Sequence, residues 1–314
     1  MIGRIVEIAE DDRHLAVERG FMTVRSGGRE IGRVPLDDVG AVIANAHGLT
    51  YSNNLVVALA ERGASLVVCG RNHRPVAWLW PVVGHHAQGT RMRAQKEAPR
   101  PLEKRLWQQI VKAKIAQQAS VLSALGRPTA PIALLQHRVG SGDPENMEAQ
   151  AARRYWPLMF GDDFRRDRDD GGINALLNYG YTVLRAAAAR AICGAGLHPA
   201  IGISHRSEDL ALADDLMEPF RPMVDLVTAW LVADGVTEVT KEAKRELALV
   251  TAMDMRTERG VTPLATCLER LAVSLAQSFE TGRAALQLPF APVPLELPRR
   301  AMPEQEHGES APEP

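Results

Sequence analysis

The pattern of apolar residues changes at about Pro101, and this change constrains the fold more than any other feature of the sequence. Before it, residues 1–80 consist of short apolar runs separated by turn residues, a pattern typical of β-strands. One helix is expected among them, from about Thr50 to Gly63. After Pro101, apolar residues recur at helical spacing. The sequence therefore predicts an α+β fold, in which a small, antiparallel β-rich N-terminal domain (residues 1–83) precedes an all-helical catalytic domain (residues 101–288).

Capping residues, glycines and prolines mark the helix boundaries in the second domain. Asp143-Pro144 predicts a helix start, with aspartate as N-cap and proline in the first helical position, and Pro157 predicts its end. A long helix is expected from about Ile173 to Cys193, where glycines follow. The remaining helices are expected over residues 102–125, 223–232, 240–249 and 263–275.

Two segments have little apolar content. Residues 84–100 contain His85, His86 and several basic residues, and we expect them to form a basic linker. Residues 289–314 are rich in proline and glutamate, and they cannot supply a core. We expect this last segment to be a disordered tail.

The composition, with 46% hydrophobic and 24% charged residues, is that of a globular protein. We find no charged-then-apolar leader and no apolar run near the roughly 20 residues of a membrane helix, so a cytoplasmic location without membrane contact is expected. The three cysteines lack CxxC spacing and are expected to be reduced thiols. The motifs GxxxxGK[ST], GxGxxG and HExxH are absent, which argues against nucleotide-hydrolase, dinucleotide-binding and zincin functions.

The stretch from His205 to Pro222 contains one histidine, five carboxylates and two arginines beside leucine and methionine residues. Carboxylates and neutral imidazole are natural ligands of divalent cations, so a metal site is predicted if a further ligand comes from elsewhere in the chain. Asp214 or Asp215 can share a helix face with Glu218, from which they are four and three residues distant. A solvated acidic helix face is the alternative.

Glu148, Asn174 and Asn178 are weaker candidates when each is taken alone. Glu148 lies about one turn into its helix, where an ordinary first-turn acid is favoured by the helix dipole. Asn174 and Asn178 lie on an alanine-rich helix, and buried amides need partners. They are expected either to bind backbone groups or to orient a ligand.

Five short motifs in order along the chain resemble a known protein family. They are Asn146-Met-Glu148-Ala, Ile173 to Tyr181, Gly196 to Gly202, His205, and Asp215 to Pro222. Together they resemble the CRISPR-associated spacer-acquisition integrase family, in its larger, catalytic subunit. The likeness covers about residues 1–288 and is greatest to the compact form found with single-effector (type II) systems.

The resemblance implies roles for individual residues. Glu148, His205 and Glu218 would be the catalytic residues that hold Mg²⁺ or Mn²⁺. Many relatives carry aspartate where this chain has Glu218, so Asp215 is a competing third ligand or a supporting residue, and Asn178 is a second supporting candidate. Candidate DNA contacts are Arg221, which lies within a family motif, and, on charge alone, Arg71, Arg74, Arg91, Arg93, Arg165 and Arg166.

The resemblance also implies an activity and partners. Family members insert short foreign DNA fragments into a CRISPR repeat array, in antiviral defence, by attack of a 3′-hydroxyl on a phosphodiester. A metal-dependent DNA integrase and endonuclease is therefore expected. It would act on double-stranded DNA as a homodimer joined through its N-terminal domains, in a larger complex with a small CRISPR-associated partner of nuclease fold. The alternatives are a non-catalytic DNA-binding scaffold of the same fold and a metal-dependent hydrolase of small phosphates.

Overall fold

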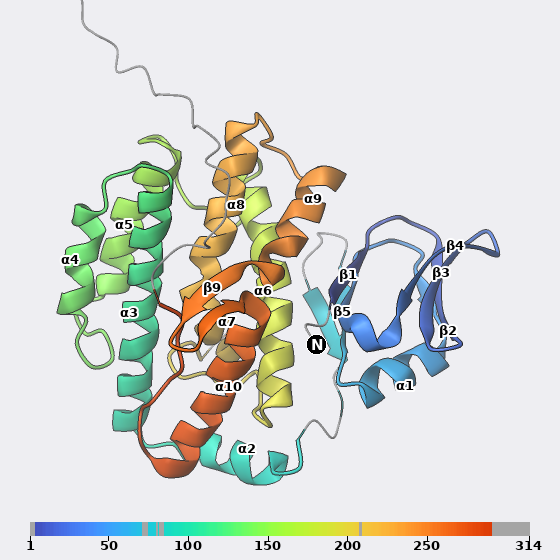
Figure 1. The fold of residues 1–314 in the computed structure, drawn as a ribbon, viewed down its shortest axis with the longest axis horizontal. Coiled ribbons are helices and arrows are strands. Elements are labelled where there is room, and N and C mark those ends of the chain that lie inside the picture. The colour runs from blue at the N-terminus through green and yellow to red at the C-terminus, as the bar shows by residue number, and fades with distance from the viewer. Residues whose placement is uncertain (1–3, 71–74, 80, 82–84, 207–208, 291–314) are drawn as a thin grey trace, which may run out of the picture.

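The computed structural model describes residues 4–70, 75–79, 81, 85–206 and 209–290 (Figure 1). Strands come first along the chain and helices follow, which confirms the predicted order of the two parts. The strands of the first part form two four-stranded sheets. The first sheet has the order β4-β3-β2-β6, with β2 (Arg13–Glu18), β3 (Phe21–Ser26), β4 (Arg29–Pro35) and β6 (Thr50–Tyr51). The second has the order β1-β5-β7-β8, with β1 (Arg4–Ile8), β5 (Val39–Ala44), β7 (Ser65–Cys69) and β8 (Pro75–Leu79).

The prediction of an antiparallel sheet is right for β2, β3 and β4 and wrong for most of the second sheet. There, β1, β5 and β7 run parallel, and β8 alone is antiparallel to its neighbour. The connection from β5 to β7 contains α1 (Asn53–Glu61), since parallel neighbours need a crossover rather than a hairpin. All six residues of β5 are buried, as expected of a strand that is covered on both faces.

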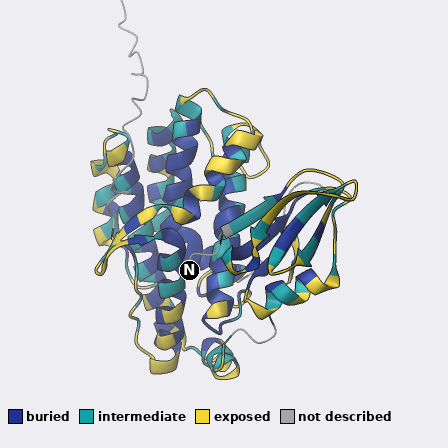
Figure 2. Cartoon of the chain, turned by 45° about the vertical axis from the view of Figure 1, so that its right-hand side comes forward, coloured by how far each residue is buried: buried dark blue, intermediate teal, exposed yellow. Residues whose placement is uncertain are grey.

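The second sheet contributes to two hydrophobic cores (Figure 2). Val42 and Leu66 pack into the core of the N-terminal part, whereas the residues that follow them, Ile43 and Val67, belong to the core of the helices. Alternate side chains of a strand point to opposite faces, so one sheet can join both cores. The long helix α6 (Ile173–Gly194) packs on β5 and β7, which mounts the strands against a central helix of the second part.

The second part is built from helices that surround α6 and α8 (Figure 1). They are α3 (Arg100–Ala124), α4 (Ala130–Arg138), α5 (Met147–Phe160), α7 (Ala211–Met217), α8 (Arg221–Ala233), α9 (Lys241–Ala248) and α10 (Leu264–Thr281). Gly180 permits the close approach of α6 and α8, because a Cβ atom there would lie 2.4 Å from Val224 Cγ1. Within the described residues, no helix is long and apolar enough to cross a membrane.

The second part is largely helical, as expected, with one departure: β9 (Asp254–Thr257) and β10 (Gly260–Pro263) form an antiparallel hairpin ahead of α10. In addition, the segment that we expected to be a basic linker contains α2 (Gln88–Lys96), which packs against α10. Polar contacts stabilise α2 where apolar ones are few. The buried side-chain amide of Gln95 donates to His198 O and Ile201 O, at 2.9 and 2.7 Å.

Candidate active site

Glu148 lies in the first turn of α5, and two side chains fix the backbone there. The N–H groups of Met147 and Glu148 donate to the two carboxylate oxygens of Asp143, at 2.8 and 3.0 Å. Asn146, at a left-handed φ of 53°, is the N-cap and accepts from Ala149 N at 3.2 Å. The helix therefore begins three residues later than predicted, with Asp143 as an additional cap, and the double cap defines where the Glu148 side chain starts.

Glu218 lies between α7 and α8, in a 3₁₀ turn at Glu218–Phe220. Pro219 and Pro222 lack backbone N–H groups, so a regular α-helical ladder cannot run through this segment. The side chain of Glu218 is 4% exposed and points into the helical core. The neighbouring Asp214 points elsewhere, since it pairs with Arg185 at 2.6 Å.

The two glutamates meet at Lys114 of α3. Its Nζ atom lies 2.6 Å from Glu148 Oε1 and 2.5 Å from Glu218 Oε2. On the other side, Arg221 Nε lies 2.9 Å from Glu218 Oε1. Sequence reasoning did not identify Lys114 as part of the site. The available signal was its place four residues after Ile110 and seven before Val121, on the face of α3 that is buried.

These contacts keep the buried groups charged. Burial by itself raises the pKa of Glu218, but Arg221, Lys114 and His205 lower it below the usual value. Burial by itself lowers the pKa of Lys114, but Glu218 and Glu148 raise it. The smallest of these effects on Glu218 is that of His205, which contacts neither glutamate directly in the described contacts.

His205 is oriented by Asp215 of α7, whose side chain is completely buried. Asp215 Oδ1 lies 2.7 Å from His205 Nδ1, and the same carboxylate accepts from the backbone N–H groups of Ile203, Ser204 and His205. The ring of Trp107 packs edge-on against the imidazole, with centroids 5.8 Å apart. Asp215 therefore fixes both the loop and the ring, and it is fully occupied in doing so.

The donor set fits a hard divalent cation, although the closed arrangement of a metal centre is not formed. No three His, Cys, Asp or Glu side chains come together closely enough to hold a metal ion within the described ranges. The ammonium of Lys114 instead lies between the two carboxylates. The short contact to Glu218 Oε2 lacks the alignment of a hydrogen bond, so this buried oxygen has no hydrogen-bond donor among the described residues. A buried carboxylate oxygen in that state can accept a further cation.

A further buried carboxylate, Asp225, links three helices just beyond this group. Its Oδ2 accepts from Tyr155 of α5 at 3.0 Å, and its Oδ1 accepts from Tyr181 of α6 at 2.5 Å. Tyr155 follows Glu148 by seven residues, and Asp225 follows Glu218 by seven. The bond between them therefore fixes α5 and α8 relative to each other, two helical turns from the glutamates.

The other predicted residues have varied surroundings. Asn178 does not contact the glutamates; its side chain accepts from Arg166 Nη2 at 2.7 Å and donates to Arg168 O at 2.9 Å. Arg91 pairs with Glu280 at 3.2 Å and donates to Ala195 O, so it supports α2. Arg93 is exposed on α2. Arg71 and Arg74 lie outside the described residues.

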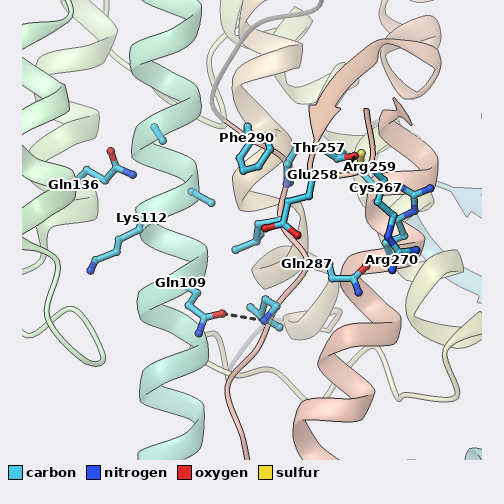
Figure 3. A pocket seen from close by; sticks show the side chains of 15 residues that line it. Gln109, Lys112, Gln136, Thr257, Glu258, Arg259, Cys267, Arg270, Gln287 and Phe290 are labelled. Atoms are coloured by element: carbon cyan, nitrogen blue, oxygen red, sulfur yellow. Dashed lines mark hydrogen bonds between the residues drawn. The ribbon is translucent and has the colours of Figure 1, made fainter. Parts of the chain in front are cut away.

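A separate pocket of about 550 Å³ lies on another face of α3 (Figure 3). It is lined by Gln109, Lys112 and Gln136, by the β9–β10 turn and by Leu286 to Phe290. Lys112 and Lys114 differ by two positions, or about 200° around a helix, so they face opposite sides of α3. None of the glutamates or histidines described above lines this pocket.

The chain matches the family model of CRISPR associated protein Cas1 over residues 6–252. It is 36% identical over 280 residues to the CRISPR-associated endonuclease Cas1 of Neisseria meningitidis serogroup C (strain 8013), which covers 87% of this chain and 91% of that protein. Its fold is similar to that of a casposase bound to integration product, with TM-score 0.74, 17% identity, and coverage of 90% and 92% of the two chains. It is also similar to a Cas6-RT-Cas1–Cas2 complex, with TM-score 0.72, 18% identity, and coverage of 91% of this chain and 36% of that one. The chain belongs to the Cas1 family of CRISPR-associated proteins.

Proposed function

We propose that this protein is a metal-dependent DNA integrase and endonuclease that inserts short foreign DNA into a CRISPR repeat array by 3′-hydroxyl attack on a phosphodiester. The observation that carries the proposal is the convergence of Glu148 and Glu218, beside His205, in a member of the Cas1 family. The name of the curated relative, an endonuclease, and the integration product bound to the similar casposase support the same class of reaction.

The proposed ligands are Glu148, His205 and Glu218, and the proposed ion is Mg²⁺ or Mn²⁺. When bound, the ion would polarise the scissile phosphate and help to position the attacking oxygen. We assign Asp215 to orienting His205 rather than to the third ligand position, because its oxygens already accept the ring nitrogen and three backbone N–H groups.

The cationic side chains would bind the charged substrate. Lys114 lies between the two glutamates and balances their charge, and a divalent ion, when bound, would take over this role. Its ammonium would then be available to a phosphate oxygen a short distance away. Arg221 keeps Glu218 ionised and places a second positive charge beside the same space.

The proposed assembly is a homodimer in a heteromeric complex with a small CRISPR-associated partner and double-stranded DNA. The similar Cas6-RT-Cas1–Cas2 complex supports a partner of this kind. We also propose that the protein is of the compact form that works with single-effector systems.

A strand-transfer assay tests the proposal, with short duplex DNA, a repeat-containing target and Mn²⁺. Glu148→Ala and His205→Ala should abolish joining. Glu145→Ala is the matched control, since this exposed carboxylate three residues earlier pairs only with exposed Arg138 among the described residues. It should join DNA as the wild type does. Joining that survives in both site variants would overturn the metal-site assignment, and DNA binding without joining by the wild type would indicate a scaffold.

A further inference from the structure

We propose that Arg166 is a DNA-binding residue that holds a backbone phosphate beside the candidate active site, which rests on the function proposed above. The structure gives Arg166 a set of neutral partners. Its Nη1 donates to Asn174 Oδ1 at 2.9 Å and to Asp167 O at 2.7 Å, and its Nη2 donates to Asn178 Oδ1 at 2.7 Å. A guanidinium has five N–H donors, so the Nε–H and one Nη2–H remain for a further acceptor.

The two asparagines are themselves fixed, so they hold the arginine in one orientation. Asn174 Nδ2 donates to Arg165 O at 3.0 Å, and Asn178 Nδ2 donates to Arg168 O at 2.9 Å. Each amide thus presents its nitrogen to the loop backbone and its oxygen to Arg166. Because the asparagines are four residues apart, they lie on one face of α6 at its first turns. Sequence reasoning expected these amides to bind backbone or to orient a ligand, and they bind the backbone and orient an arginine.

An aromatic ring connects Arg166 to the active-site group. The guanidinium carbon of Arg166 lies 5.5 Å from the centroid of the Tyr181 ring, and that of Arg221 lies 4.8 Å from the same centroid. The Tyr181 hydroxyl is anchored on Asp225, so the ring cannot swing away. Arg221 in turn pairs with Glu218. Arg166 is therefore connected to the proposed metal ligand Glu218 through the Tyr181 ring and Arg221.

Arg166 forms no ion pair with a carboxylate of the described residues, in contrast to Lys114 and Arg221. Burial lowers the pKa of Arg166 and Arg221 lowers it further, and the opposing effects of Tyr181 and Asp225 do not cancel this shift. Keeping a half-buried cation without a counter-ion is costly unless an anion arrives in the working complex. A phosphodiester carries one negative charge and oxygen acceptors, which match the two remaining N–H donors.

Binding of fluorescent duplex DNA over a salt series, in EDTA and without target, tests this assignment apart from catalysis. Arg166→Gln should weaken binding by about tenfold, and it should reduce the log–log salt slope by about 0.9, the value for one phosphate contact. The matched control is Arg153→Gln, which removes the same charge from an exposed arginine of α5. Its effect should be less than about twofold.

A second variant keeps the arginine and supplies the missing counter-ion. Asn178→Asp would place a carboxylate 2.7 Å from the Arg166 guanidinium, and it should weaken DNA binding and flatten the salt slope as Arg166→Gln does. Circular dichroism verifies folding of each variant. Equal effects of Arg166→Gln and Arg153→Gln, or wild-type binding by Asn178→Asp, would refute the inference. Failure of the wild type to bind and join DNA would instead refute the function on which it rests.

Discussion

Asp225 should make the stability of this protein depend on pH, in a direction opposite to that of an ordinary ion-paired carboxylate. Burial raises the pKa of Asp225 from 3.8 to about 6, although Tyr181, Tyr155 and Arg221 lower it. The folded chain therefore holds the Asp225 proton more tightly than the unfolded chain. Its contribution to stability is fully present below pH 3.8 and is lost as the pH rises through about 6. The difference between the two pKa values corresponds to about 3 kcal/mol.

Urea unfolding of the wild type and Asp225→Asn between pH 4 and 8 measures this contribution. Other carboxylates titrate in both proteins, so the difference between their free energies of unfolding isolates Asp225. We expect this difference to change by about 3 kcal/mol in favour of the variant as the pH rises from 4 to 7. Tyr155→Phe removes a donor that lowers the pKa of Asp225, so it should move the transition to higher pH. Parallel pH profiles of wild type and Asp225→Asn would refute the reasoning.

Further predictions concern close packing and the cation between the glutamates. Gly180→Ala should destabilise the fold by about 1–3 kcal/mol in urea unfolding, because the added Cβ clashes with α8. Gly194→Ala in the same helix meets no atom within 4 Å and should not destabilise; equal losses would contradict the packing argument. Gly202→Ala places a Cβ 2.1 Å from His205 O, so it should abolish strand transfer with the circular dichroism spectrum retained. Lys114→Met should lower metal-free stability by about 3–5 kcal/mol. Mn²⁺ should restore more stability in that variant than in the wild type. Equal stabilisation of both proteins by Mn²⁺ in thermal unfolding would argue against the idea that the Lys114 ammonium and the metal ion use the same position between the glutamates.

The order of strands and helices was predictable, but the direction of the strands was not. The spacing of the apolar residues and the positions of glycine and proline separate the two parts. Strand and helix patterns can be distinguished within a few residues. In contrast, the apolar sequences of β5 and β7 do not indicate whether these strands pair in parallel or antiparallel. The full burial of β5 arises from two cores on opposite faces of one sheet, and it depends on where α6 packs. That information is not local to either strand.

The same limit separates the parts of the site that sequence could and could not predict. Short motifs, each contiguous in the chain, predict Glu148, His205 and Glu218 as ligands, and their role stays a prediction. No such motif contains Lys114, because its position beside the glutamates depends on how α3 is rotated against α5 and α8. A lysine on an otherwise buried helix face is a recognisable signal, since a buried ammonium needs anionic partners. Applied to α3, this rule requires an acidic partner near Lys114, and the structure supplies two, from separate elements.

Arg166, in the loop before α6, is a partly buried cation without an ion-pair partner among the described residues, in contrast to Lys114. Lys114 is a buried cation with two carboxylates, and its charge is satisfied within the chain. Arg166 has only neutral oxygen partners among the described residues, yet two asparagines and a ring hold it in place. Fixing a long side chain costs conformational entropy, and protein contacts that leave its charge unbalanced do not by themselves account for that cost. The arrangement is understandable if the balancing charge belongs to the substrate, and the asparagine signal in the sequence then marks DNA binding rather than core structure.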